Sequence, residues 1–417
     1  MASRRSTLVP DSPVEEDEAI PTYRIDLSLP PTERYVKLAT DFAPRMKQIT
    51  PLFDTVLESA LPWSFLRSIV KFAALLILRR VYSSEETQEL VGISEASGVD
   101  MHFLVALNLL LDILLGCTSG GVLTRLKKRK GEETYLGEKQ ADTEPRARMM
   151  HFRTLDWGMP ELRSVLVVLE FVRSNSKEPE TVIARTVTYA GFVGVLTGVR
   201  QNLSMSLNFR PTHNCSALSL RMHQSLVLLG VQPSISSVLR QHLLCPEHHP
   251  PTINNITKSI TKTRSAPCYI ILCSRTETTI IQKDLDNAQT KSSTDFIVHT
   301  NHDFAPTDPS NQTNIQKESS SILGMETLVE ESEERRDCIQ SKWTALAKRQ
   351  QREFKKGKGR ESPAIFEQTL QKWVKAYPIM NECTHFGCIM DPGTGTIRWL
   401  ERGVEDLEES EIIEQLI

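Results

Sequence analysis

The segment LNLLLDILLGCTSGG (residues 107–121) decides how the fold of this chain is interpreted. Its apolar run ends at Gly116, and Cys117 then opens a region of β-branched stretches broken by turn residues. A cysteine is a strong nucleophile only as its thiolate, and the α-amine of an N-terminal cysteine can serve as its base. The unperturbed pKa of such an amine, about 7.7–8.0, suits this role. We therefore predict that Cys117 is a nucleophile unmasked by cleavage after Gly116.

Cleavage at this bond has a local chemical basis. Gly116 leaves room for the Cys117 thiol to attack the preceding carbonyl, so that an N-to-S acyl shift and hydrolysis could cut the chain. The alternative is a buried structural thiol, which free cysteines commonly are. The motif FRTLDWG (residues 152–158) favours the nucleophile. Its arginine could lower the pKa of a nearby thiol, and its aspartate could orient the α-ammonium group.

Length and composition set broad limits. The chain of 417 residues has room for a large core, in one elaborated domain or in two or three. Its 49 basic and 52 acidic residues give no field that would attract nucleic acid, so no nucleic-acid partner is expected. Cys245, His248 and His249 fit no tight ligand spacing, so we expect neither a metal nor a cofactor.

The order of segments predicts an α+β protein. Residues 1–20 are rich in proline, serine and acids and are expected to be a disordered tail. Residues 21–116 read as a mainly helical segment, and residues 117–417 as a strand-rich catalytic domain. Polar insertions are expected near 126–148 and 305–332.

The apolar stretch from Leu61 to Tyr82 allows two interpretations. Its length and its cations, among them Arg67 and Lys71, argue against a transmembrane span. It is either a buried helix of the N-terminal segment or an apolar element that contacts a membrane surface or a lipid substrate. Ser83 begins a capping box that predicts a further helix after it.

These motifs resemble the acid ceramidase and N-acylethanolamine acid amidase family of N-terminal-nucleophile (Ntn) hydrolases. The similarity runs from Pro21 to about Gly403, in the family's order. The segments that carry it are PTYRIDLSLPPTERY, LNLLLDILLGCTSGG, FRTLDWG, YAGFVGVLTGVRQNLSMSLNFR, APCYIILCSR, VHTNHDF and EERR. The resemblance implies an αββα sandwich and autocleavage at Gly116–Cys117.

The resemblance also implies roles for individual residues. Arg153 and Asp156 match the family's RN[ML]D[FY] segment, and we expect the Arg153 guanidinium to keep Asp156 ionised and to lower the thiol pKa. Asn301 matches the asparagine of TNYD, whose amide stabilises the oxyanion. Arg335 matches the arginine of DDRR, with Arg336 as a substitute. The non-catalytic alternative for Arg153 and Asp156 is a surface ion pair, and for Asn301 it is a turn-forming role.

One position departs from the family. Phe209 stands where the animal ceramidases and amidases have a glutamate. Its neighbour Asn208 resembles the LNY element of bile-salt hydrolases and penicillin V acylases, in which that asparagine lines the oxyanion hole. We expect Asn208 to be a second oxyanion donor.

The resulting hypothesis is a self-processing amidohydrolase of N-acyl lipids, with ceramide as the first candidate substrate and N-acylethanolamines as the second. The alternatives are an acylase of other N-acyl amides and a lipid-binding pseudoenzyme. No cysteine precedes Cys117, so the two fragments are expected to stay together without a disulfide. The N-terminus lacks a secretory signal, which predicts a cytoplasmic protein. Animal family members are lysosomal, so an incomplete N-terminus would imply a lysosomal or vacuolar one.

Overall fold

A computed structural model of the chain describes residues 19–60, 63–110, 116–125, 147–246, 252–304, 328–358 and 362–403. The predicted tail, apart from residues 19 and 20, and most of the two predicted insertions lie outside these ranges. Residues 147–148 and 328–332, expected to be parts of the insertions, belong instead to strand β3 and helix α9.

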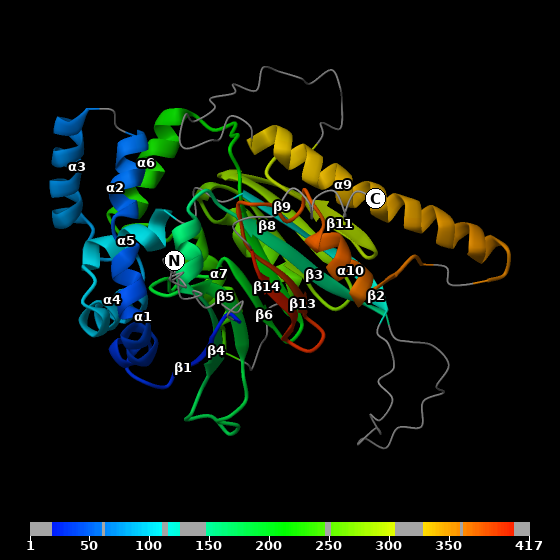
Figure 1. Ribbon diagram of the computed structural model, residues 1–417, viewed down its shortest axis with the longest axis horizontal. Helices are drawn as coiled ribbons and strands as arrows, with labels where there is room; N and C mark the ends of the chain where they lie inside the picture. The colour runs from blue at the N-terminus through cyan, green and yellow to red at the C-terminus, as the bar shows by residue number, and fades with distance from the viewer. Residues whose placement is uncertain are drawn as a thin grey trace, which may run out of the picture.

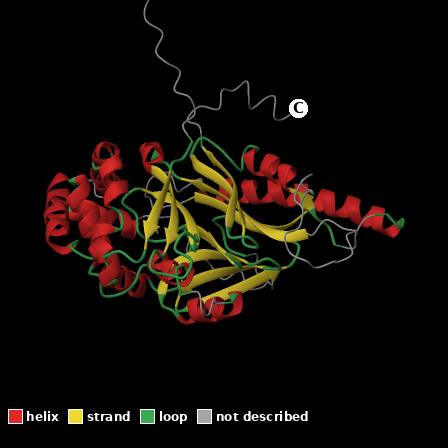
Figure 2. Ribbon diagram, turned by 90° about the horizontal axis from the view of Figure 1, so that it is seen from below, coloured by secondary structure: helices red, strands yellow, loops and turns green. Residues whose placement is uncertain are grey.

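Two β-sheets form the centre of the molecule, one above the other in Figure 2. The eight-stranded sheet has the order β1-β4-β5-β6-β7-β8-β9-β10. The six-stranded sheet has the order β11-β2-β3-β13-β14, with β12 paired to β2. In the first sheet the strands are β1 (Thr22–Asp26), β4 (Leu166–Val172), β5 (Ala184–Tyr189), β6 (Thr197–Arg200), β7 (Leu203–Phe209), β8 (Ser265–Cys273), β9 (Thr278–Leu285) and β10 (Asn287–Ser293). In the second they are β2 (Gly116–Arg125), β3 (Ala147–Asp156), β11 (Phe296–His299), β12 (Ile365–Phe366), β13 (Thr384–Asp391) and β14 (Thr396–Arg402).

Helices cover the outer face of each sheet. On the six-stranded sheet, α9 (Leu328–Lys355) and α10 (Glu367–Lys375) bury Trp343 and Leu370 against the outward side chains of β2 and β3. On the eight-stranded sheet, α7 (Ile235–Leu243) and α8 (Ile253–Lys262) bury their isoleucines and leucines in the larger core. The predicted α+β class and αββα order are therefore confirmed. Figure 1 shows α9 continuing outward beyond the sandwich.

The N-terminal helices gather at the other end of the sandwich, next to α6 (Ala217–Leu228) (Figure 1). They are α1 (Val36–Gln48), α2 (Leu52–Ala60), α3 (Ser64–Ile77), α4 (Ser84–Ser97) and α5 (Met101–Leu110). Short 3-10 helices lie at Pro31–Glu33 and Pro160–Val165. This segment also supplies a strand, because β1 pairs in parallel with β4 at the edge of the eight-stranded sheet. It therefore shares a ladder and a core with the rest of the chain.

Helix α3 presents most of its apolar surface to solvent. Phe65 and Phe72 are 73% and 65% exposed, and Trp63, just before the helix, is 70% exposed. Ala74 is its buried residue among those described. The interpretation of this stretch as a buried helix is thus wrong, and the contact with lipid remains open. In the described part of the chain, no helix combines the length and the apolar character that crossing a bilayer requires.

Candidate active site

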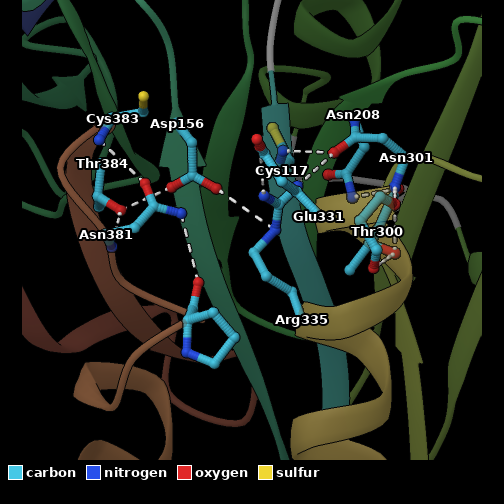
Figure 3. Close-up of polar contacts among 12 residues, drawn as sticks. Cys117, Asp156, Asn208, Thr300, Asn301, Glu331, Arg335, Asn381, Cys383 and Thr384 are labelled. Carbon is cyan, nitrogen blue, oxygen red and sulfur yellow. Dashed lines mark hydrogen bonds and ion pairs between the residues drawn. The ribbon is translucent and has the colours of Figure 1, made fainter. Parts of the chain in front are cut away.

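Cys117 lies at the start of a central strand and is fully buried. Strand β2 runs between β3 and β11, and its register places Gly116 opposite Asp156 and Ser119 opposite His299. The strands thereby bring three of the sequence motifs to one end of the sheet. Figure 3 shows Asn301 on one side of Cys117 and Asp156 on the other, with Arg335 reaching in from α9.

The Cys117 thiol faces the eight-stranded sheet. Arg153 donates from Nη2 to Cys117 Sγ at 3.2 Å, and from Nη1 to the carbonyl oxygens of Leu207 at 2.8 Å and Leu196 at 3.2 Å. Burial raises the pKa of the Cys117 thiol to about 11, and the guanidinium of Arg153 opposes this rise. In the uncut chain the thiol is therefore protonated at neutral pH, and Arg153 is placed to stabilise the thiolate once a base forms it.

The backbone nitrogen of Cys117 is held as well. It donates to Asn301 Oδ1 at 2.8 Å, and Arg335 donates from Nη2 to the same oxygen at 3.2 Å. The Asn301 amide donates from Nδ2 to the carbonyl of Phe209 at 2.8 Å. Asn301 thus orients the atom that cleavage would turn into the α-amine. Its expected oxyanion contact stays a prediction.

Asp156 faces the α9 side of the same sheet. Thr384 on β13 donates to Asp156 Oδ1 at 2.7 Å, and Arg335 Nε lies 3.8 Å from Oδ2. Burial raises the pKa of this carboxyl, while Arg335, Thr384 and then Arg153 counteract the rise. The nearest cation is therefore Arg335 rather than the expected Arg153. Residues three apart on a strand point to opposite faces, so Arg153 turns toward the thiol and Asp156 toward α9.

Two further predicted residues, Asn208 and Arg336, make no contact with Cys117 through the bonds that hold them. Asn208 accepts a hydrogen bond from Ser119 Oγ at 2.9 Å and donates to the carbonyls of His299 and Thr300 at 3.3 Å each. It lies beside the site, and among the described residues no hydrogen bond joins it to Cys117. Arg336 does not substitute for Arg335, because its Nη1 bonds to His302 Nε2 instead.

Sequence reasoning missed several residues of this site. Ser119 carried a usable signal, because two positions after Cys117 it shares the same strand face. Thr384 carried none, since it meets Asp156 only through the pairing of β13 with β3. A buried pair behind the site was also missed: Tyr189 Oη lies 2.7 Å from His385 Nδ1, and His385 Nε2 lies 3.1 Å from the Trp157 carbonyl. Burial lowers the pKa of His385 to about 3, so this imidazole is neutral.

The segments on either side of Gly116–Cys117 are joined by many contacts and by no disulfide, because all eight cysteines are free. Arg240 on α7 contacts Glu89 on α4 at 2.5 and 2.6 Å. Asn108 on α5 bonds to the backbone of Gly191 and Val193, at 2.8 Å each. Within the described ranges no three histidine, cysteine or acidic residues gather as metal ligands would, and His248 and His249 lie outside them.

Comparisons with known proteins find similarity to acid ceramidases and to an N-acylethanolamine acid amidase. Residues 18–82 match a family model for the beta subunit of N-acylethanolamine-hydrolyzing acid amidase. The chain is 26% identical to acid ceramidase of Heterocephalus glaber over 232 residues, and 25% identical to that of Homo sapiens over 234 residues. Each alignment covers 52% of this chain and 52% of the relative, so the chain spans about half the length of these relatives.

Acid ceramidase of Balaenoptera acutorostrata scammoni is 24% identical over 327 residues, which is 72% of this chain and 74% of that protein. A solved structure of the Caenorhabditis elegans N-acylethanolamine-hydrolyzing acid amidase ortholog matches 66% of this chain and 93% of its own, at 19% identity and a TM-score of 0.43. By the family model and these relatives, the chain is similar to the acid ceramidase and N-acylethanolamine acid amidase family.

Proposed function

We propose that this protein is a self-processing hydrolase that uses N-terminal Cys117 to cleave the amide bond of N-acyl lipids. One observation carries the proposal: both reactive atoms of Cys117 are held by buried side chains, Sγ by Arg153 and the backbone nitrogen by Asn301. A structural thiol needs neither contact. An N-terminal nucleophile needs both, because the thiol and its base belong to the same residue.

The first step converts the precursor. Cys117 Sγ attacks the carbonyl carbon of Gly116, an S–C bond forms, and the C–N bond to Cys117 breaks. The thiol proton ends on the departing nitrogen, which becomes the α-amine. Water then hydrolyses the thioester, which leaves a carboxylate on Gly116 and a free thiol on Cys117.

Turnover uses the same groups. The α-amine accepts the thiol proton, and the thiolate attacks the acyl carbonyl of the lipid. The amine returns the proton to the leaving nitrogen, an acyl-thioester remains on Cys117, and water releases the fatty acid. Arg153 stabilises the thiolate, Asn301 orients the amine, and Arg335 keeps Asp156 in place.

Ceramide is the first candidate substrate and N-acylethanolamines are the second. An apolar cavity of about 620 Å³ lies between α2, α3, α5 and α6, and Val70, Ile77 and Leu228 are among the side chains that line it. Val70 and Ile77 of this lining are also among the exposed apolar side chains of α3. On α6, Leu218 and Met222 are exposed as well. We propose that this end of the molecule rests on a lipid bilayer, from which an N-acyl lipid is drawn.

The test is hydrolysis of a panel of long-chain ceramides and N-acylethanolamines by the purified full chain. The Cys117→Ala variant is compared with Cys388→Ala, which removes another fully buried thiol. Wild type and Cys388→Ala should release fatty acid, and denaturation during turnover should trap an acyl-thioester on the wild-type fragment that begins at Cys117. Lipid binding without release in all three proteins would instead support a lipid-binding pseudoenzyme.

A further inference from the structure

The loop after β11 is fastened to α9 by a buried polar cluster. Ser332 Oγ accepts the backbone N–H of Asn301 at 2.6 Å and donates to Thr300 Oγ1 at 2.8 Å. Thr300 Oγ1 in turn donates to the carbonyl of Ser332 at 2.9 Å. Ser332, Thr300 and Asn301 are all fully buried. The residue that holds the Cys117 nitrogen is therefore itself held through its backbone.

His302 completes this cluster in one protonation state. Its Nδ1 lies 2.8 Å from Ser332 Oγ, and its Nε2 lies 2.6 Å from Arg336 Nη1. A guanidinium can only donate, so Nε2 must be the acceptor and the ring proton must sit on Nδ1. With this tautomer, His302 and Asn301 both donate to Ser332 Oγ, and Ser332 donates to Thr300. Every contact in the cluster then has one donor and one acceptor.

All of the α9 residues that bond to the loop after β11 lie on one face of the helix. Ser332, Arg335 and Arg336 are spaced three and four residues apart, so they lie on neighbouring turns of the same face. Ser332 fixes the Asn301 backbone, Arg335 bonds to the Asn301 side chain at 3.2 Å, and Arg336 bonds to His302. The loop between them has no freedom to move Asn301 while these contacts persist.

We infer that Ser332, His302 and Arg336 are positioning residues that hold Asn301 against the Cys117 nitrogen, and that they do so only while His302 is neutral. The inference rests on the proposed function, and it adds a pH requirement to it. A second proton on His302 would remove the acceptor at Nε2 and set an imidazolium against Arg336. The contact would break, and the support of Asn301 through Ser332 would loosen.

The charges around His302 agree with a neutral ring. On α9 it faces Arg336, Glu333 and Asp337, and on its own loop Asp303. The ring centroid of His299 on β11 lies 6.1 Å away. Burial and then Arg336 lower the pKa of His302, and the acids offset only part of this. A lowered histidine pKa means that the neutral arrangement holds at neutral pH and is lost as the pH falls through the folded-state pKa.

The experiment compares pH profiles of full-chain variants between pH 4 and 8. The His302→Gln side chain can still accept from Arg336 and donate to Ser332, but it does not titrate. We expect it to keep kcat within roughly 3-fold of wild type at pH 7.5 and to lose less activity on the acid side. Arg336→Met removes the partner of His302 Nε2 at every pH, so its kcat should fall across the whole range and should depend less on His302 protonation. His102→Gln on α5 is the matched control and should reproduce the wild-type profile.

Ser332→Ala tests the central contact. It removes the hydroxyl that accepts from the buried Asn301 N–H, so we expect kcat to fall by roughly 10-fold with KM within about 2-fold. Ser341→Ala on the same helix, whose hydroxyl bonds only to α9 carbonyls, should leave both unchanged. Unaltered kcat in Ser332→Ala, or an acid limb that His302→Gln does not move, would overturn the inference in an active enzyme.

A second measurement separates this inference from the proposed function. In protein labelled with 15N-histidine, the His302 signals, assigned by their loss in His302→Gln, should show the Nδ1–H tautomer at pH 7.5. That result in a protein that neither cuts itself nor hydrolyses lipid would refute the proposed function and keep the cluster. The Nε2–H tautomer or an imidazolium at pH 7.5 would refute the cluster, whatever the activity.

Discussion

Replacing Thr384 by valine should shift the pH dependence of activity without leaving a cavity in the site. Valine has nearly the shape of threonine, so packing at this fully buried position is kept while the hydroxyl is lost. That hydroxyl donates to Asp156 Oδ1 at 2.7 Å and accepts from the Asn381 N–H at 2.9 Å. Removing it withdraws a hydrogen bond that favours the ionised carboxylate.

The size of the shift follows from this contact. A hydrogen bond to a charged group contributes about 1.5–3 kcal/mol, and one pKa unit corresponds to about 1.4 kcal/mol. The pKa of Asp156 is already raised by burial, so Thr384→Val should raise it further. If Asp156 must be ionised for activity, the activity is lost as the pH falls through this pKa. The acid limb of the profile should therefore move to higher pH, and a loss of about 1.5 kcal/mol or more corresponds to activity on that limb roughly 10-fold or more below wild type.

The assay is the rate of autocleavage and of lipid hydrolysis from pH 4 to 8. Thr384→Ser keeps the hydroxyl and is the matched control, with a profile expected within about 0.3 pH units of wild type. Circular dichroism confirms that each variant is folded over the range. An acid limb that stays in place in folded Thr384→Val would refute the view that this hydrogen bond sets the ionisation of Asp156.

Three further outcomes are expected. Arg240→Met leaves Glu89 buried beside Arg34 alone, so urea unfolding should show a free energy of unfolding lower by about 3 kcal/mol. The control Arg221→Met, on the exposed side of α6, should change it by no more than about 0.5 kcal/mol. Equal values for the two variants would contradict a stabilising buried pair. After cleavage, mild denaturant without reductant should separate the two fragments on a sizing column, because every cysteine is free; a need for reductant would contradict this. Phe65→Asp with Phe72→Asp on α3 should lower binding to phosphatidylcholine vesicles by about 10-fold or more and leave autocleavage unchanged, while equal binding would remove α3 from the membrane contact.

Local sequence was sufficient where one strand or one turn carries the chemistry. Cys117 is the second residue of β2, Arg153 and Asp156 stand near the end of β3, and Asn301 lies two residues after β11. Their motifs could be recognised in order along the chain. The layered α+β architecture was predictable for the same reason, since a helical segment followed by β-branched runs implies it together with the family resemblance.

Contacts made across the fold were not predictable. Thr384 meets Asp156 because of the register of β13 on β3, and Ser332 meets Asn301 because α9 packs across that end of the sheet. Neither depends on a local pattern. The pairing of Asp156 with Arg335 was missed because spacing in the sequence was taken for nearness, whereas the alternation of a strand separates Arg153 from Asp156.

The exposed face of α3 shows a second reason for error. Apolar composition predicts burial on average, and it does not reveal whether the chain has another element to cover the helix. Here Phe65 and Phe72 remain uncovered, and apolar composition alone could not exclude the buried helix.

The most direct test of the mechanism is the intact mass of the purified chain, measured with time at mildly acidic and neutral pH beside Cys117→Ala. The mechanism predicts two fragments from the wild type, the larger of which begins with Cys117 by N-terminal sequencing, and a single uncut chain from the variant. A wild-type chain that stays whole while remaining folded, or a variant cut at the same bond, would contradict the role of Cys117 as an unmasked nucleophile.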